Sequence, residues 1–255
     1  MAATKKERLD LALVRRGLAE SREKAQRIIR AGAVRVGGQQ VDRPDAPVGP
    51  DAAIALLEGP RFVSRGGEKL DAAFAAFALD VTELTCLDVG ASTGGFTDCL
   101  LQHGARQVIA VDVGKGQLHW KLRNDPRVKV IEGVNARYLQ GGMLPAVPGF
   151  ACVDVSFISL TKVLPAVIGV LSPGSHMVTL IKPQFEAGRA EVKKGGVVRD
   201  QGVRDAVVES IRRFGVETLL LQWMGVVESP LKGPAGNAEY LAHWLTGGGT
   251  RTEGP

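Results

Sequence analysis

Four ionisable side chains, far apart in the sequence, are the residues of this chain best suited to chemistry: Lys69, Asp154, Lys182 and Glu239. Lysine is protonated near neutral pH and becomes a base only when its pKa falls, which desolvation and a second cation nearby both promote. Two lysines in one pocket can therefore act as a base and as a cation that stabilises negative charge on an oxygen. The two carboxylates would hold them in place. This set suits removal of a proton from a hydroxyl group that is to act as a nucleophile.

An alternation of strand and helix patterns must place these side chains together. The strand patterns cover 85–89, 108–113, 128–131, 151–154, 177–181, 218–227 and 239–245. The helical patterns cover 68–77, 95–103, 118–123, 160–171 and 202–214. Such alternation is typical of an α/β fold with a parallel sheet, here with an antiparallel last strand. Asp154 and Lys182 end adjacent strands, so we expect them side by side at the carboxyl edge of the sheet.

A glycine-rich turn, residues 88–96, follows the first predicted strand. Its glycines let backbone amides approach a ligand at the positive end of the next helix. Asp112 lies 24 residues after Asp88 and ends the second strand, where a carboxylate can accept both hydroxyls of a ribose. Asn135, after the third strand, is placed to bond an adenine edge, although loop asparagines are also common caps. A turn of this kind alone would also serve a dinucleotide.

The order Asp88-X-Gly90, with Ser92 and Gly94, resembles the S-adenosylmethionine version of this turn more than the dinucleotide version, whose third glycine is replaced here. The resemblance implies a cofactor site formed by Asp88, Gly90, Ser92, Thr93, Gly94, Gly95, Phe96, Asp112, Val113, Asn135 and Asp154. We therefore expect S-adenosylmethionine as the cofactor. We expect no metal ion, because the four histidines show no ligand spacing.

The net positive charge of the chain lies entirely in its first quarter. Residues 1–69 hold 14 Lys and Arg against 9 Asp and Glu, whereas residues 70–255 hold 18 of each kind. A small basic module attached to a larger neutral one is common among nucleic-acid enzymes, because attraction to phosphate is mostly electrostatic. The charge by itself would also fit an ordinary solvated surface.

The basic module shows helical patterns at 8–16 and 22–31, then a hairpin at 33–41 with two central glycines, and a strand pattern at 52–57. Across residues 6–60 it resembles the small alpha-L RNA-binding domain that is named after a ribosomal protein. The resemblance implies docking on the phosphates of structured RNA, read mainly by shape. The side chains expected to make these contacts are Arg8, Arg22, Lys24, Arg27, Arg30 and Arg35.

The Lys–Asp–Lys–Glu set resembles the catalytic tetrad of FtsJ-like ribose methyltransferases. The whole chain resembles the TlyA family of ribosomal RNA cytidine 2′-O-methyltransferases, also labelled hemolysins. The matching segments are 64–70, 88–96, 154–160, 182–185, 194–200 and 229–240. The resemblance implies a Rossmann-like class I methyltransferase sheet and cytidine of small- or large-subunit ribosomal RNA as the target. It also implies Lys182 as the base, with Lys69, Asp154 and Glu239 as orienting partners.

The chain is expected to divide into an RNA-binding domain at 1–60, a linker at 61–64, a methyltransferase domain at 65–246 and a tail at 247–255. Its apolar runs are shorter than the roughly 18 residues of a membrane span, and its start is too charged for an export signal. We expect a cytoplasmic protein whose partner is ribosomal RNA or a ribosomal subunit, with no obligate protein partner. The three cysteines fall in apolar stretches and are expected to be buried free thiols.

Two other functions remain open on the sequence. A non-catalytic RNA-binding or ribosome-assembly factor could retain the cofactor turn, although the complete tetrad argues against it. A membrane-active role would fit the hemolysin label, but there is no strongly amphipathic cationic helix outside the basic module. Phe157, which could stack on a target base, is expected instead in the core. The basic, glycine-rich loop at 188–199 could fold over RNA or be a solvated loop.

Overall fold

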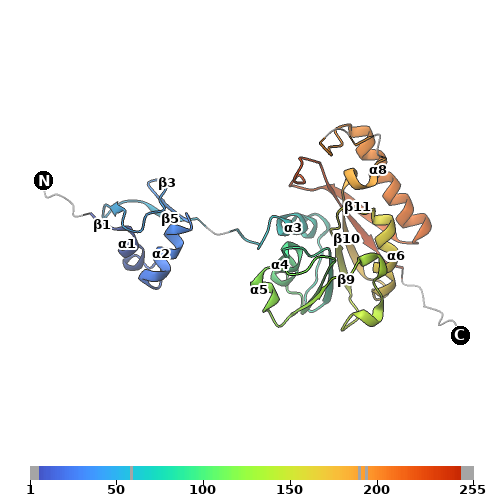
Figure 1. Cartoon of the computed structure of the whole chain (residues 1–255), viewed down its shortest axis with the longest axis horizontal. Coiled ribbons are helices and arrows are strands. Elements are labelled where there is room, and N and C mark those ends of the chain that lie inside the picture. Colours follow the sequence, from blue (N-terminus) through green and yellow to red (C-terminus); the bar gives the residue numbers. More distant parts are fainter. Residues whose placement is uncertain (1–5, 58–59, 189–190, 193–194, 248–255) are drawn as a thin grey trace. The chain divides into compact units, whose positions relative to one another are not determined.

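The structure is a computed structural model that describes residues 6–57, 60–188, 191–192 and 195–247. The chain forms two compact units, Met1–Arg61 and Phe62–Pro255 (Figure 1). One hydrophobic core lies in the first unit and two lie in the second. The predicted tail at 247–255 falls outside the described residues, apart from its first position.

The first unit is a pair of helices packed with short strands. Its elements, in chain order, are β1 (Glu7–Arg8), α1 (Leu9–Arg15), α2 (Arg22–Arg30), β2 (Val34–Val36), β3 (Gln39–Gln40), β4 (Pro47–Val48) and β5 (Ile54–Leu56). Strands β3, β2 and β5 form an antiparallel sheet, and β1 pairs with β4. The two predicted helices, the hairpin and the later strand are confirmed. The β1–β4 pair was missed, because two-residue strands show no alternation.

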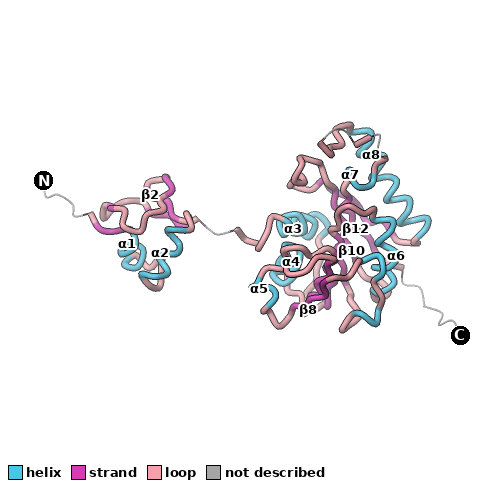
Figure 2. Tube along the Cα trace, viewed as in Figure 1, coloured by secondary structure: helices cyan, strands magenta, loops and turns pink. Residues whose placement is uncertain are grey.

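The second unit is built on one sheet, which lies between helices in Figure 2. Its seven strands are β6 (Thr85–Val89), β7 (Gln107–Asp112), β8 (Val128–Glu132), β9 (Phe150–Val153), β10 (His176–Ile181), β11 (Gln222–Glu228) and β12 (Tyr240–Leu245). Their order is β11-β12-β10-β9-β6-β7-β8. Strand β12 runs antiparallel to both of its neighbours, and the other pairs are parallel. The predicted α/β fold with an antiparallel last strand is confirmed.

Helices cover both faces of this sheet. The longer ones are α3 (Gly66–Phe77), α4 (Gly95–Gln102), α6 (Leu160–Val170) and α8 (Gln201–Arg213), and the shorter ones are α5 (Trp120–Arg123), α7 (Pro183–Glu186), η1 (Ala136–Tyr138), η2 (Gly141–Met143) and η3 (Phe214–Thr218). Successive residues of a strand point to opposite faces. Accordingly, Cys86 of β6 joins a core with α3 and α4, whereas Leu87 joins a core with α6 and α8.

The register of the sheet brings three strand ends together. Strands β9 and β10 run parallel, and β12 runs antiparallel to β10 with Ile181 opposite Tyr240. Lys182 and Glu239 are the next residues outward from that pair, so they leave the sheet at one place. Asp154 follows the end of β9, the other neighbour of β10. The topology thus assembles residues that are far apart in the sequence.

The predicted strand at 218–227 is wrong over its first four residues, because β11 begins only at Gln222. The chain instead continues α8 as the π-helical turn η3. Gly215 lies against the Trp244 ring, where a Cβ would be 2.2 Å from the nearest ring carbon, and Leu221 is buried in the core. A short apolar run such as 219–221 cannot be assigned from its periodicity alone. Helix α7 was also missed, although Pro183 at its start is a helix signal.

The segment expected to be a linker, 61–64, is largely part of the second unit. Phe62 is 3% exposed and belongs to the core that contains α3. A Cβ on Gly67 would lie 2.2 Å from the Phe62 ring, so the close contact depends on that glycine. The Val63 amide donates to Asp98 Oδ2 at 2.8 Å. The second unit therefore begins at Phe62 rather than at residue 65.

Candidate active site

The four predicted catalytic residues lie together at the carboxyl edge of the sheet. Lys69 of α3 pairs with Glu239, which precedes β12, at an Nζ–Oε2 distance of 2.5 Å. Lys182 pairs with Asp154 at an Nζ–Oδ1 distance of 2.5 Å. All four line one cavity. The structure therefore brings the whole set together as two lysine–carboxylate pairs.

These pairs are shielded from solvent to different degrees. The side chain of Glu239 is 1% exposed and that of Lys69 is 12% exposed, so this pair is buried. The side chains of Lys182 and Asp154 are 10% and 22% exposed, and this pair is the more accessible one. Each lysine balances one carboxylate, so the four groups can lie close together without net charge. The difference between the pairs comes from the carboxylates, because the two lysines are exposed to nearly the same degree.

Ser156 is a third partner at the Lys182 end of the cavity. Lys182 Nζ donates to Ser156 Oγ at 2.9 Å, in addition to its contact with Asp154. The sequence analysis missed this residue. Ser156 lies beyond the end of β9 and outside any regular element, so no periodicity of the sequence indicated its position. The ammonium group of Lys182 is thus oriented by two oxygens.

The glycine-rich turn contacts the same cavity through its backbone. Gly90 has a φ of +86°, and a Cβ there would lie 2.2 Å from the carbonyl oxygen of Asp154. Gly95 begins α4, and a Cβ there would lie 2.4 Å from Ser64 Oγ. Gly94 differs from expectation, since it faces Leu122 and does not line the cavity. The glycines therefore permit close packing of this turn against neighbouring chain segments.

A second cavity adjoins the first along the strand ends. Four residues line both cavities: Gly90, Ser92, Asp154 and Ser156. The second cavity is also lined by the predicted residues Asp112, Val113 and Asn135, by Gln117 and Arg137, and by Phe157 and Lys162. Thr93, Gly95 and Phe96 line the first cavity. Most of the predicted cofactor residues thus surround one continuous space that reaches the lysine pairs.

Asp112 links the glycine-rich turn to the loop after β7. Its Oδ2 accepts from the Ser92 amide at 2.7 Å, and its Oδ1 accepts from the Gly114 amide at 2.6 Å. Each carboxylate oxygen accommodates more than one hydrogen bond, so both can still accept from a ligand hydroxyl. Asn135 caps η1, because its Oδ1 accepts from the Arg137 amide at 3.1 Å. The carboxylate expected to hold a ribose is therefore rigidly placed.

Asp88 does not line either cavity, and the prediction that it contacts the cofactor needs correction. Its side chain is fully buried beneath the turn, and Thr97 Oγ1 donates to its Oδ2 at 2.6 Å. Burial, and to a smaller extent the charge of Asp154, raises the pKa of Asp88 to about 7, while the Thr97 hydrogen bond acts in the opposite direction. Asp88 therefore supports the turn from inside the core.

Phe157 also differs from expectation, because it is not a core residue. Its side chain is 90% exposed, and its backbone adopts a φ of +63°, which is uncommon for a bulky residue. Its ring lies 5.0 Å from that of Phe185, centroid to centroid. Lys182 Nζ lies 5.9 Å from the Phe185 centroid. An exposed aromatic surface thus extends from the Lys182 end of the cavity.

In the first unit, two of the predicted RNA contacts are fixed by a buried carboxylate. Asp10 is fully buried and accepts from Arg8 Nε and from Arg22 Nε, each at 3.0 Å, and from Gln26 Nε2 at 2.9 Å. The hydrogen bond from Arg8 is the main cause of a pKa well below the usual range for Asp10. Sequence analysis did not identify Asp10, whose neighbours on α1 are apolar. Arg8 and Arg22 are consequently oriented and partly neutralised.

Of the other four predicted RNA contacts, three are more available than Arg8 and Arg22. Lys24 pairs with Glu20 at 2.9 Å. Arg27, Arg30 and Arg35 are exposed and form no ion pair with any residue that the structure describes. These three guanidinium groups are free to meet a polyanion.

The residues that line the two cavities fit S-adenosylmethionine. An oriented carboxylate at the end of the second strand, a glycine turn without room for a Cβ and the lysine pairs lie in that order along one space. The sheet and this site define a methyltransferase that takes its methyl group from S-adenosylmethionine.

Comparison with known proteins identifies the family. The model of FtsJ-like methyltransferases matches residues 62–244, and the model of the S4 domain matches residues 7–54. The chain is 47% identical to the 16S/23S rRNA (cytidine-2′-O)-methyltransferase TlyA of Mycobacterium tuberculosis, over 93% of this chain and 89% of that protein. It is 45% identical to hemolysin A of Brachyspira hyodysenteriae, over 93% of this chain and 99% of that protein. The chain belongs to the TlyA family of FtsJ-like methyltransferases, and its first unit contains an S4 domain.

A solved structure supports the same assignment. A protein of Streptococcus thermophilus, described as a candidate hemolysin, superposes with a TM-score of 0.73 at 43% identity, covering 96% of this chain and 90% of the other. Among the residues that the structure describes, no helix is long and apolar enough to cross a membrane. The three cysteines are buried and are not joined in disulfide bonds, as predicted.

Proposed function

We propose that this protein transfers the methyl group of S-adenosylmethionine to the 2′-hydroxyl of a cytidine in ribosomal RNA. The observation that carries the proposal is the Lys182–Asp154 pair, at the junction of the two cavities beside the glycine-rich turn. A hydroxyl oxygen placed there would lie next to Lys182 Nζ, which contacts Asp154 and Ser156, two residues that line both cavities. The names of the similar proteins point to the same substrate.

In this mechanism the chain has to align three atoms and remove one proton. The cofactor supplies a methyl group that is already activated on a sulfonium centre. Lys182, in its neutral form, would accept the proton of the 2′-hydroxyl while the oxygen forms its bond to the methyl carbon and the bond from that carbon to the sulfonium sulfur breaks, so that the cofactor leaves as a neutral thioether. Asp154 and Ser156 orient the Lys182 nitrogen, and they stabilise the ammonium group once it has taken the proton. Lys69, held by Glu239, supplies positive charge to the oxygen as the proton leaves.

The cofactor contacts follow from the cavity lining. The backbone around Gly90 and Ser92 would face the methionine and sulfonium end, near the lysine pairs. Asp112 would accept from the two hydroxyls of the cofactor ribose, and Val113 and Asn135 would contact the adenine. Asp88 would act indirectly, by supporting the turn from below. Alignment of methyl and oxygen then depends on a preformed turn.

Recognition of RNA is divided between the two units in this proposal. Arg27, Arg30 and Arg35 would contact phosphates, and Arg8 would present a guanidinium group oriented by Asp10. Phe157 would stack on the target base, because it is exposed beside the reaction site. A ribosomal RNA substrate also implies a cytoplasmic location. We infer no obligate protein partner.

Mapping of 2′-O-methylated cytidines in ribosomal RNA tests the proposal. Cells with the gene, cells without it, and cells carrying only Lys182→Ala should be compared. We expect one or more cytidines to be methylated only when the wild-type protein is present. An identical methylation map in all three strains would overturn the assignment of substrate. Methylation assays of the recombinant protein with free ribosomal RNA and with assembled ribosomal subunits would show which form is the substrate.

A further inference from the structure

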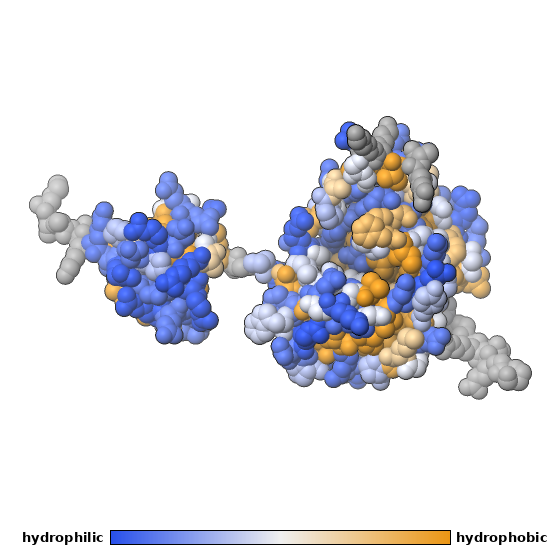
Figure 3. All heavy atoms as spheres, viewed as in Figure 1, coloured by the Kyte–Doolittle hydropathy of each residue, from blue (hydrophilic) through white to orange (hydrophobic). Residues whose placement is uncertain are grey.

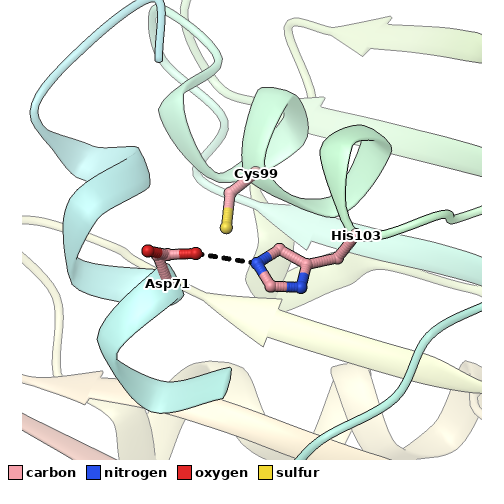
Figure 4. A group of neighbouring side chains, drawn as sticks. All are labelled: Asp71, Cys99 and His103. Atoms are coloured by element: carbon pink, nitrogen blue, oxygen red, sulfur yellow. Dashed lines mark hydrogen bonds and ion pairs between the residues drawn. The ribbon is translucent and has the colours of Figure 1, made fainter. Parts of the chain in front are cut away.

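A cluster of three different side chains lies between α3 and α4, away from both cavities. Its members are Asp71, Cys99 and His103, and the nearest donor atoms of the three all lie within 4.8 Å of one another (Figure 4). None of them lines the cavities described above. The spacing of the histidines in the sequence did not reveal the cluster, because Asp71 lies on a different helix from Cys99 and His103.

We propose that this cluster binds a divalent transition metal ion of the zinc class. A thiolate, an imidazole and a carboxylate are the three donor types that zinc binds in proteins, whereas magnesium and calcium prefer oxygen donors alone. The negative charges of a thiolate and a carboxylate would also balance the two positive charges of the ion. The donor set therefore selects the metal class.

The helices present these donors to a common point. Cys99 lies on α4, and His103 is the C-terminal cap of that helix, one turn later. Their side chains therefore lie on one face. Asp71 of α3 faces them, and in Figure 4 the sulfur points toward the space beside the carboxylate and the imidazole. Donor atoms around tetrahedral zinc are separated by roughly 3.5 Å. Small side-chain rotations, without helix movement, would bring the three donors to that spacing.

The surroundings of His103 and Asp71 also suit a metal ligand. The His103 ring stacks on Phe74, with centroids 4.2 Å apart and planes inclined by 19°, so its orientation is fixed. His103 Nε2 lies 2.8 Å from Asp71 Oδ1, and an ion would replace this hydrogen bond. The side chains of Asp71 and His103 are each 28% exposed, whereas Cys99 is buried. The ion would thus enter from solvent and keep one position for water, a total of four ligands.

A metal here would join α3, which carries Lys69, to α4, which follows the glycine-rich turn. Asp71 stands two positions after Lys69 on α3, and α4 begins at the glycine-rich turn. A coordinate bond across the helix pair would oppose their separation and stabilise the folded state by mass action. The role is structural, so the reaction itself would not require the ion.

Titration of the metal-free full-length protein with Co²⁺ tests the proposal, because a cobalt–thiolate bond produces a characteristic near-ultraviolet absorption. We expect this band in the wild type, its loss in Cys99→Ser, and its retention in Cys86→Ser, a matched buried cysteine outside the cluster. Absence of the band from the wild type, or its survival in Cys99→Ser, would overturn the proposal.

Two more variants keep the test decisive if Cys99→Ser fails to fold. Asp71→Asn and His103→Gln change partly exposed side chains, and each should weaken Zn²⁺ binding at least tenfold in calorimetry. His243→Gln is the control, because His243 forms a separate pair with His176. Zn²⁺ should also raise the melting temperature of the wild type, and a chelator should reverse the rise. Unchanged affinity in both cluster variants would show that the ion binds elsewhere.

Discussion

Lys69 and Glu239 are 170 positions apart in the sequence, and their side chains meet at 2.5 Å. Glu239 is almost fully buried, and its Oε1 lies close to Gly233. A Cβ on Gly233 would lie 2.5 Å from that oxygen, so the loop before β12 leaves room for the carboxylate only because residue 233 is glycine. The position of the Lys69 ammonium is therefore set by tertiary structure on both sides of the pair.

Replacement of Glu239 should expose the importance of this pair. Glu239→Gln keeps the size of the side chain but leaves a nearly buried ammonium without its counter-ion, which costs about 3 kcal/mol of stability. Methyl transfer should fall by about a hundredfold, with a much smaller change in cofactor affinity. Glu217→Gln, on the exposed surface of η3, is the matched control. Chemical denaturation and single-turnover assays measure the two effects, and full activity in Glu239→Gln would remove the pair from the mechanism.

Asp112→Ala should weaken binding of S-adenosylmethionine by about 1–3 kcal/mol, because it removes the acceptor of the cofactor ribose hydroxyls. The substitution also releases the Ser92 and Gly114 amides, so the turn loses support at the same time. Isothermal calorimetry measures the affinity. An unchanged dissociation constant would exclude Asp112 from the cofactor site.

Asp112→Asn separates the two effects of that substitution. The asparagine side chain keeps one acceptor oxygen and has an NH2 donor in place of the other oxygen. It should therefore support the turn better than alanine does. We expect a melting temperature between those of the wild type and Asp112→Ala. Cofactor affinity should still fall, because one ribose hydroxyl then faces a donor.

The buried carboxyl of Asp88 should make stability depend on pH. Its pKa is raised to about 7 in the folded protein from its ordinary value of 3.8, chiefly by burial. Between these values the folded state binds the extra proton, so this contribution to stability is present at low pH and is lost as the pH rises to about 7. Asp88→Asn should therefore gain stability relative to the wild type, at roughly 1 kcal/mol per pH unit from about pH 5 to pH 7.

Comparing the wild type with Asp88→Asn separates the effect of Asp88 on the pH dependence of stability from the effects of other groups. His243 has a pKa lowered to about 4, mainly by burial and also by His176, so its contribution rises with pH and is common to both proteins. Urea unfolding at several pH values measures the difference in the free energy of unfolding. A difference that does not vary with pH would mean that Asp88 is ionised throughout.

The sequence predicts strand ends better than side-chain environments. Asp154 and Lys182 could be placed side by side, because parallel strands end at one edge and each residue follows an apolar strand. Phe157 could not be placed, because its exposure depends on a left-handed backbone after the strand, and apolar character alone predicted burial. Asp88 was misjudged as a cofactor contact, and Asp10 was missed, because polar character predicted exposure for both. A buried carboxylate is unusual, and its partners Thr97 and Arg8 are revealed only by the fold.

The boundary between the two units provides a further test. A fragment that begins at Phe62 should fold and bind S-adenosylmethionine, because Phe62 completes its core and none of the proposed cofactor contacts come from the first unit. A fragment that begins at Ser64 should be less stable, since it lacks Phe62 and the Val63–Asp98 hydrogen bond. The longer fragment should methylate ribosomal RNA far more slowly than the full chain. Equal rates would show that the second unit finds its target alone.

The account depends most directly on Lys182. Lys182→Ala should bind S-adenosylmethionine and RNA with nearly unchanged affinity, because the proposed proton transfer occurs only in the transition state. Its single-turnover methylation of ribosomal RNA should fall by about a thousandfold or more. Lys129→Ala, which changes an exposed lysine on β8, should keep the wild-type rate. A rate for Lys182→Ala close to that of the wild type would contradict the assignment of Lys182 as the base.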